Sequence, residues 1–381
     1  QRRILATLFK VEDGAFHKVA NVIGETMKLH PHGDASIGEA LVVLANKEYF
    51  IERQGNFGNI VTGHPAAAAR YIECRLTDLA KETLYRKALT TFRPSYDGRN
   101  NEPEFLPVKL PVALLVGAEG IAVGMSTRIL PHNFCELLAA QIAILQEEPF
   151  TLEPDFPTGG LVDATEYDDG LGRVKVRARI EPRDEKTVVI REVPFSTTTE
   201  SLVASIENAA LRGKIKIGAI SDYTTDRVEI EIALPRGVYA DEVIPQLYAH
   251  TDCELSISSN IVLIRNRRPV EMSAREVLVQ LTDQLVERIR AELELELDQL
   301  EAERHRLTLE RIFIEEKVYS RLEEAGTEEE IDREVRAGLE PHLHLLGDRE
   351  VTDDDIERLL RIPIRRISKY DRDRNRRDTE A

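Results

Sequence analysis

Tyr71 follows Arg70 directly and lies four residues before Arg75, and these three side chains could together carry out phosphoryl chemistry. Cations close to a phenol, whose ordinary pKa is about 10, favour the phenolate form that a nucleophile needs. Guanidinium groups also match the oxygens of a phosphoryl transition state. An arginine beside a tyrosine is common and usually structural, so the pair alone leaves both interpretations open.

The pattern of residues 71–76 indicates which of these side chains share a face. Ile72, Cys74 and Leu76 alternate with polar neighbours, which is typical of a half-buried strand. The alternation places Tyr71 and Arg75 on the exposed face. The alanines at 66–69 favour a helix just before, but the alternation leads us to predict a strand at the tyrosine.

A second cluster, His30-Pro31-His32-Gly33-Asp34, has a spacing that can bind metal. Binuclear hydrolases with this opening continue Asp-His, whereas Ala35 follows here and no later His/Cys cluster supplies the remaining ligands. The same residues are short, rigid donors just before an expected helix N-terminus, which suits a phosphate. We favour the phosphate contact, with a purely structural turn as the alternative.

A third segment, Gly117–Met125, places three glycines around the branched side chain of Ile121. Glycines let the backbone approach a surface closely, and a projecting aliphatic side chain can part stacked base pairs. Core packing is the alternative role for Ile121. The segment lacks the spacing of a nucleotide-binding glycine loop.

Residues 173–180 predict a strand with four cations on one face, because Arg173, Lys175, Arg177 and Arg179 alternate with apolar residues. A solvated outer face explains the pattern about equally well. Since no acidic residue lies among the four cations, we favour a track for phosphates.

Other patterns define the elements that must position these residues. Ile37, Ala40, Leu41 and Leu44 predict a one-sided helix capped by Asp34. Residues 94–156 are rich in Pro and Gly and predict loops. Further strands are expected at 188–193, 228–234 and 256–265, and helices at 201–212 and 241–250.

The last third of the sequence predicts a long helical arm. Residues 273–325 contain no Pro or Gly, so an unbroken helix there would be about 75 Å long. A seam for a second helix recurs every seven residues, at Val279, Val286, Leu293, Leu300, Leu307 and Ile314. We also expect a helix at 356–367 after an acidic cap at 353–355, and a disordered charged tail at 372–381.

Composition limits the class of protein. The 381 residues are 42% hydrophobic and 31% charged, which is typical of a globular chain of two to four domains. No apolar run approaches the ~20 residues of a membrane span, and three scattered cysteines argue against disulfides, so we expect a cytoplasmic location. The chain starts at Gln1 without an initiator Met, which predicts a trimmed part of a longer protein.

The net charge of -17 does not by itself exclude a polyanion partner, because the acid is unevenly distributed. Residues 1–150 hold 16 Lys and Arg against 17 Asp and Glu, whereas residues 270–381 hold 20 against 31. Nucleic acid is therefore disfavoured as a partner of the last third only.

In their order along the chain, these segments resemble the DNA breakage-reunion component of bacterial type IIA topoisomerases, the A subunits of gyrase and topoisomerase IV. The matching motifs run from residue 30 to residue 133, and the remainder fits at the level of pattern. The motifs are His30–Asp34, Gln54–Gly58, Ala67–Tyr71 with Arg75-Leu76, Tyr96-Asp97-Gly98, Gly120–Met125 and Pro131-His132-Asn133.

The resemblance implies a role for each matching residue. Tyr71 would attack a DNA phosphodiester and become joined to the new 5′-phosphate, while Arg70 would stabilise the transition state. Ile121 would intercalate and bend the DNA. The other expected DNA contacts are His30, His32, Arg2, Arg3 and Arg75, together with Lys175 and Arg177 of the basic strand at 173–180.

The implied fold is α+β and multidomain. It comprises a winged-helix breakage-reunion domain at 1–156, an α/β tower domain at 157–270 and, at 271–371, a coiled-coil arm ending in a C-terminal dimer gate. Residues 372–381 remain the charged tail. Two tyrosines are needed to cut two strands, so a homodimer would be part of the mechanism.

The resemblance also implies partners and cofactors. Duplex DNA would be the substrate, and Mg²⁺ and ATP would be bound by a separate B subunit in an A2B2 enzyme, with no metal site on this chain. Ala35 stands where related enzymes carry a serine four residues before the acidic Glu39, so the hydroxyl for a water-bridged quinolone contact is missing. A non-catalytic DNA-binding dimer with a coiled-coil arm is the alternative function.

Overall fold

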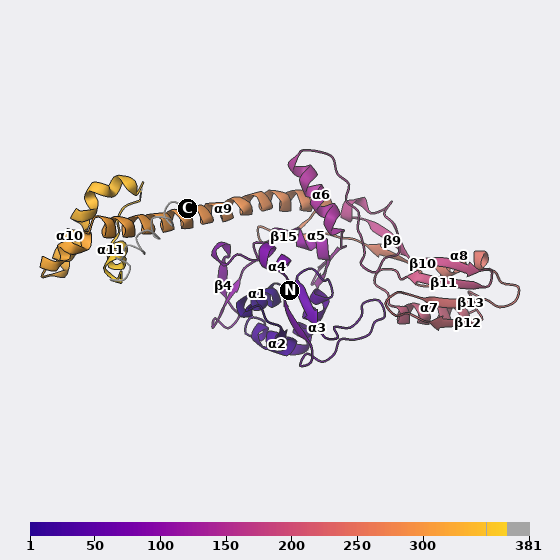
Figure 1. Cartoon of the computed structure of the whole chain (residues 1–381). Coiled ribbons are helices and arrows are strands. Elements are labelled where there is room, and N and C mark those ends of the chain that lie inside the picture. The colour runs from indigo at the N-terminus through magenta and orange to yellow at the C-terminus, as the bar shows by residue number, and fades with distance from the viewer. Residues whose placement is uncertain (348, 364–381) are drawn as a thin grey trace. The chain divides into compact units, whose positions relative to one another are not determined.

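The computed structural model describes residues 1–347 and 349–363, and its fold is mixed α/β (Figure 1). Contacts divide the chain into two compact units, one from Gln1 to Arg288 and one that begins at Ile289. Among the described residues, three hydrophobic cores lie in the first unit and one lies in the second.

Short helices around a three-stranded antiparallel sheet of order β1-β3-β2 form the first core. Leu8, Leu41, Phe50 and Leu114 are among its fully buried side chains. The elements are α1 (Arg2–Val11), β1 (His17–Lys18), α2 (Val19–Met27), α3 (Asp34–Ala45), β2 (Ile51–Gln54), β3 (Glu73–Leu76), α4 (Asp78–Thr83), η1 (Lys87–Leu89), α5 (Val112–Val116) and α6 (Phe134–Leu145).

Helix α3 confirms the predicted one-sided helix, because Ile37, Leu41 and Leu44 are buried in the core. The predicted cap is wrong. Gly33 occupies the cap position without a side-chain bond, and Asp34 is already the first helical residue. Its carboxylate therefore acts only on the helix dipole.

The segment rich in Pro and Gly is less irregular than expected. It contains α5, α6 and two antiparallel hairpins, β4 (Phe92–Pro94) with β5 (Asn101–Pro103) and β6 (Ala118–Ala122) with β7 (Met125–Ile129). Gly124, at φ +78°, supplies the left-handed residue that the tight β6–β7 turn needs. The glycines thus shape hairpins as well as loops.

A four-stranded sheet of order β10-β11-β13-β12 forms the second core with helices α7 and α8 (Figure 1). Val188, Ile190, Ile230 and Ile232 join both helices in one core, so the helices cover one face of the sheet. The elements are β10 (Arg179–Asp184), β11 (Thr187–Glu192), α7 (Thr199–Leu211), β12 (Ala219–Asp222), β13 (Ile230–Ala233) and α8 (Ala240–His250).

Two predicted strands are each divided in the structure. The first splits at Ala178 into β9 (Arg173–Arg177) and β10, which belong to different sheets, because the Ala178 N–H bonds to the Cys253 carbonyl rather than to a ladder partner. The second splits into β14 (Glu254–Ser258) and β15 (Val262–Arg265). The remaining elements of the first unit are β8 (Leu161–Asp163), η2 (Asp168–Gly170) and β16 (Arg268–Glu271).

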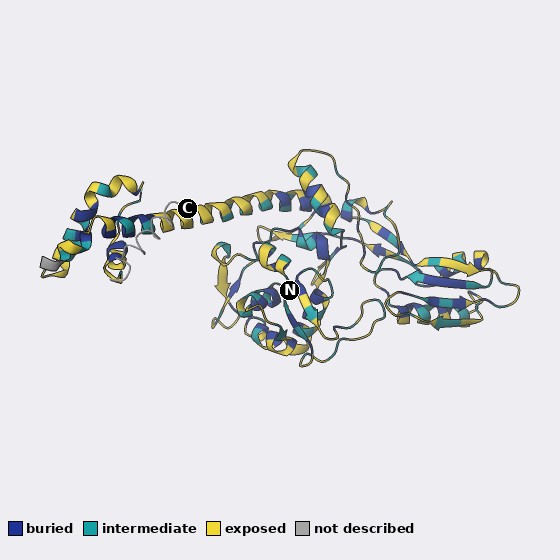
Figure 2. Cartoon of the chain, viewed as in Figure 1, coloured by how far each residue is buried: buried dark blue, intermediate teal, exposed yellow. Residues whose placement is uncertain are grey.

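The expected arm is helix α9 (Ala274–Glu315), which ends ten residues before the predicted end at 325. Lys317 takes a left-handed conformation, which ends the helical path of α9, and it is followed by the short 3-10 helix η3 (Val318–Glu324). Along α9 the seam is exposed at Leu293 and Leu300, by 60% and 61%, and buried at Ile314 (Figure 2). Within the part of the chain that is described, no helix has both the length and the apolar character that crossing a membrane requires.

The last core joins the end of α9 to short helices. These are α10 (Glu328–Leu339), η4 (Glu340–Leu345) and α11 (Asp353–Leu360). The predicted acidic cap is wrong by position, since Thr352 caps α11 in a reciprocal pair with Asp355. The helix predicted at 356–367 is wrong at both ends, since α11 starts at Asp353 and ends at Leu360, and residues 361–363 are not helical. Residues 364–367 of that prediction and the predicted tail at 372–381 lie outside the described residues.

Candidate active site

Tyr71 lies in a turn between the alanines and strand β3. Its N–H donates to the Ala68 carbonyl at 2.8 Å, and β3 begins only at Glu73. The strand prediction is therefore confirmed after the tyrosine and wrong at the tyrosine itself. Ile72, Cys74 and Leu76 are buried as the alternation predicted, and the Tyr71 side chain is 64% exposed.

This turn is fixed to the N-terminus of α2. The Val19 N–H donates to the Ile72 carbonyl at 3.0 Å, and the Ala20 N–H donates to the Ala69 carbonyl at 3.1 Å. N–H groups in the first turn of a helix have no partner within it. The carbonyls on either side of Arg70-Tyr71 supply those partners, so the helix holds the backbone on both sides of the tyrosine.

The glycine-rich segment 54–59 is hydrogen-bonded to residues 64–67, which lead into the same turn. The Ala67 N–H donates to the Asn56 carbonyl at 2.9 Å, and the Asn59 N–H donates to the His64 carbonyl at 3.0 Å. Gly58 has φ +80°, and a Cβ there would lie 2.6 Å from the His64 oxygen. Only glycine therefore fits at this position.

Arg70 and Arg75 differ in what they already bind. The Arg70 guanidinium lies 4.5 Å from the centre of the Tyr71 ring and makes no ion pair with any described residue. The Arg75 Nε donates to Glu52 at 2.8 Å, and its Nη1 donates to the Gly14 carbonyl at 2.9 Å. The hydrogen bond to Glu52 raises the pKa of Arg75. Arg70 is thus the guanidinium available to an anion beside the phenol.

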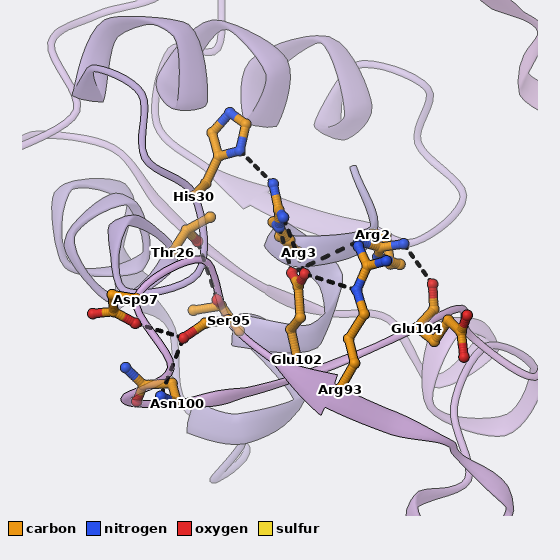
Figure 3. Close-up of polar contacts among 11 residues, drawn as sticks. Arg2, Arg3, Thr26, His30, Arg93, Ser95, Asp97, Asn100, Glu102 and Glu104 are labelled. Atoms are coloured by element: carbon orange, nitrogen blue, oxygen red, sulfur yellow. Dashed lines mark hydrogen bonds and ion pairs between the residues drawn. The ribbon is translucent and has the colours of Figure 1, made fainter.

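Arg2 and Arg3 meet Arg93 around the buried carboxylate of Glu102 (Figure 3). The Glu102 Oε1 accepts from Arg3 Nη2 at 3.0 Å and from Arg93 Nε at 3.1 Å, while Arg2 Nη2 lies 3.7 Å from Oε2. The bond from Arg3 holds the pKa of Glu102 below its ordinary value. Sequence reasoning missed both Glu102 and Arg93, and no local pattern marks either residue.

His30 is attached to this cluster. Arg3 Nη1 donates to His30 Nδ1 at 2.7 Å, and the ring of the exposed His32 lies 4.5 Å away between centres. Partial burial, His32 and Arg3 lower the pKa of His30. In the described ranges, no group of three or more His, Cys, Asp or Glu side chains could hold a metal.

One chain does not bring Tyr71 and His30 together. The tyrosine turn caps the start of α2, whereas the His30 N–H donates to the Thr26 carbonyl at its end, at 3.0 Å. The nine residues of α2, at ~1.5 Å each, place these two backbone contacts near opposite ends of a helix about 13 Å long.

Ile121 projects from the β6–β7 hairpin, where Ala122 pairs with Met125 across the turn. Its side chain is 88% exposed, which is the opposite of the core-packing alternative. Val123 at the tip is fully exposed as well, and sequence reasoning did not single it out. The hairpin thus presents two branched aliphatic side chains to solvent.

The basic strand is more nearly neutral in the structure than in the sequence. Lys175 lies opposite Asp163 of β8, and Arg177 also covers the ring of Tyr248 at 5.1 Å. Glutamates from other segments accompany the three arginines, so counting acids within the strand missed them. The ion pairs are Arg173–Glu166, Arg177–Glu254 and Arg179–Glu192.

The amino-acid sequence was compared with protein families and with known proteins. The family model for the A subunit of DNA gyrase/topoisomerase IV matches residues 1–381. The A subunit of DNA topoisomerase 4 from Borreliella burgdorferi is 53% identical over 378 residues, which cover 99% of this chain and 60% of that protein. The A subunit of DNA gyrase from Lawsonia intracellularis is 37% identical over 316 residues, or 76% of this chain and 38% of that protein.

The A subunit of DNA topoisomerase 4 from Staphylococcus epidermidis is 32% identical over 336 residues, which cover 80% of this chain and 42% of that protein. The chain therefore spans between 38% and 60% of the length of these three relatives. The resemblance carried by the motifs is confirmed, and the chain belongs to the family of DNA gyrase and topoisomerase IV A subunits.

Proposed function

We propose that this chain is the DNA-cleaving part of a type IIA topoisomerase A subunit. It would make a transient double-strand break, allow a second duplex to pass and reseal the break. The observation that carries the proposal is the exposed Tyr71 beside an arginine without an ion pair to any described residue, on a turn held by α2, in a chain of this family.

The chemistry follows from the phenol. The Tyr71 oxygen attacks a DNA phosphorus and loses its proton to solvent, and the bond from phosphorus to the 3′-oxygen breaks. The 3′-oxygen takes up a proton and leaves as a hydroxyl, while the 5′-phosphate stays on the tyrosine. Arg70 donates to the non-bridging oxygens as their charge rises. Resealing is the reverse attack, and it needs no hydrolysis because the ester keeps the bond energy.

The DNA would bind across the first unit. We propose a winged-helix domain at 1–156 with His30, His32, Arg2, Arg3, Arg75 and the Ile121 wedge, and a tower domain at 157–270 with Lys175 and Arg177. A coiled-coil arm and dimer gate would occupy 271–371. The second core, which runs from Ala178 to Cys253, supports a separate tower domain. The first core also takes in residues 261–278, and a smaller core joins Leu130 and Phe156 to Val174, so the boundaries at 156 and 270 rest on the resemblance. Since each strand needs its own tyrosine, the working form would be a homodimer.

ATP and Mg²⁺ would belong to a separate B subunit in an A2B2 enzyme located with the DNA in the cytoplasm. When bound near the cleavage site, Mg²⁺ would polarise phosphate oxygens. Among the described residues of this chain, no group of three or more carboxylate, His or Cys side chains could hold a metal ion.

The decisive experiment replaces Tyr71 with phenylalanine in the full-length protein. Mixed with the B subunit, Mg²⁺ and ATP, Y71F should neither relax supercoiled plasmid nor form a denaturant-resistant adduct with DNA, yet it should still bind duplex. Tyr223→Phe is the control, because Tyr223 is similarly exposed, at 58%, but follows β12 of the second core. Undiminished relaxation by Y71F would end the assignment.

The same assay separates the alternative function. A non-catalytic DNA-binding dimer would retain duplex but give no adduct even with Tyr71 present. The higher identity to a topoisomerase 4 protein, 53% against 37% for a gyrase protein, leads us to propose decatenation rather than supercoiling as the main activity. Comparing the two reactions in the full A and B pair tests this.

A further inference from the structure

Glu102 is the centre of a cluster of charged side chains, and one of its partners also contacts His30. Its side chain is 3% exposed, and its carboxylate lies among the guanidinium groups of Arg2, Arg3 and Arg93 (Figure 3). The three arginines come from α1 and β4, and Glu102 comes from β5. The cluster therefore ties helix α1 to the β4–β5 hairpin.

Arg3 connects this carboxylate to His30. Its Nε and Nη2 face Glu102, while its Nη1 points to His30 Nδ1 at 2.7 Å. Two of the three guanidinium nitrogens are thus held by one buried anion. That arrangement fixes the direction of the third.

The contact determines the form of the imidazole. A guanidinium has N–H donors and no acceptor, so His30 Nδ1 can only accept, and its proton must be on Nε2. The other titratable side chains near this ring are His32 and Glu102. A protonated His30 would place an N–H against the Arg3 N–H groups, which disfavours the cation. Figure 3 shows the second ring nitrogen pointing away from the cluster.

We propose that Glu102, acting through Arg3, holds His30 as a neutral imidazole whose Nε2–H donates to a DNA phosphate. Glu102 and Arg3 are then positioning residues, and Arg3 serves the DNA through His30 rather than by direct contact. The geometry of the relay is independent of the proposed function. Only the identity of the acceptor, a DNA phosphate oxygen, rests on it.

Two substitutions of His30 test the donor directly. A glutamine places its amide N–H near the position of Nε2, whereas an asparagine places it near Nδ1. We expect His30→Gln to cleave DNA within about threefold of the parent and His30→Asn to lose about 10- to 100-fold, as for a lost hydrogen bond to a charged group. Equal losses in both variants would overturn the neutral-donor role. Because His30 is half-buried at the surface, both chains should fold.

Glu102→Gln tests the relay, with Glu166→Gln as its control, since Glu166 pairs with Arg173 at an exposed site. We expect Glu102→Gln to lower cleavage by the full A and B pair about tenfold or more, because small displacements of a contacting group are costly. In the His30→Asn background it should add less than about threefold, since residues of one network are not additive. Full additivity of the two losses would mean that Glu102 acts only on stability, and would contradict the relay.

A spectroscopic readout does not depend on cleavage. In the full chain labelled with 15N-histidine and free of DNA, the His30 signal, identified by its loss in His30→Gln, should show a bare Nδ1 and a protonated Nε2 at neutral pH. Glu102→Gln should shift it towards a mixture of tautomers, while Glu166→Gln should not. A protonated Nδ1 in the parent chain would refute the relay even if Tyr71 proved to be the nucleophile. Conversely, the expected signal with an active Y71F would remove the proposed function and leave the relay intact.

Discussion

Replacing Ile121 with alanine should separate bending of DNA from binding of DNA. The side chain is 88% exposed on the β6–β7 hairpin, so it contributes little to the stability of the free chain. If it inserts between base pairs, it becomes buried only in the bent complex. Truncation removes three carbon atoms, and at about 0.8 kcal/mol for each buried carbon the bent state loses about 2.4 kcal/mol. This corresponds to a factor of about 60 in its population.

The assay compares two quantities on one short duplex. Cleavage is measured as the adduct trapped by denaturant with the full A and B pair, and affinity is measured by fluorescence anisotropy without the trapping step. We expect cleavage to fall by a few tens of fold, and affinity to fall by no more than about fivefold, because phosphate contacts dominate binding. Leu211→Ala is the control, since this residue is 85% exposed at the end of α7.

Two results would refute the reasoning. Equal losses of cleavage and affinity would mean that Ile121 is an ordinary contact and not a wedge. No loss in either would move the role to Val123, the other exposed aliphatic residue of the hairpin, which the same assay on Val123→Ala would reveal.

Three further predictions concern stability and reactivity. Gly58→Ala should lower the free energy of unfolding by more than about 3 kcal/mol, because the positive φ alone costs about 1–3 kcal/mol and the new Cβ would also meet the His64 oxygen. Gly98→Ala is the control: it also has a positive φ but has open space around its Cβ, and should cost about 1 kcal/mol in thermal unfolding. Similar costs for the two variants would contradict the tight contact at Gly58. The pKa of Glu102 lies below its ordinary value of 4.5, so its ion pairs stabilise the folded chain above that pH, and this stabilisation is lost as the pH falls through the folded pKa. The difference in the free energy of unfolding by urea between the parent and Glu102→Gln should therefore shrink from pH 7 to pH 3. A difference independent of pH would count against the ion pairs. Burial raises the pKa of Cys74 to about 12, so only the exposed Cys135 should react with a thiol reagent at pH 8 in the folded chain, and reaction of a buried thiol at a similar rate would contradict the packing.

Local patterns predicted the elements near the candidate site well. The alternation at 72–76 gave the buried face of β3, and the spacing of Ile37, Leu41 and Leu44 gave α3, because both depend on side chains a few residues apart. The exact ends were less predictable. The tyrosine falls in a turn because its flanking carbonyls bond to α2, a contact that no local period encodes.

Long-range pairing explains what the sequence could not show. Arg3 and Glu102 are 99 residues apart, and the acids beside the basic strand come from other segments. The break at Ala178 was also hidden, because its side chain stays buried while the chain passes from one sheet to the next. Charge counts along a strand therefore overestimated the free positive charge.

Helix α2 has a consequence for how mutants of this protein are interpreted. Its first turn binds the backbone on both sides of Tyr71, and the Thr26 carbonyl in its last turn accepts from the His30 N–H. Val22 and Ile23 are buried in the core at the middle of the helix. A cavity made at Val22 would tilt both ends at once without removing any group that meets DNA. Screens for loss of cleavage should therefore recover interior positions of this helix, and such hits will report misalignment, not a missing contact.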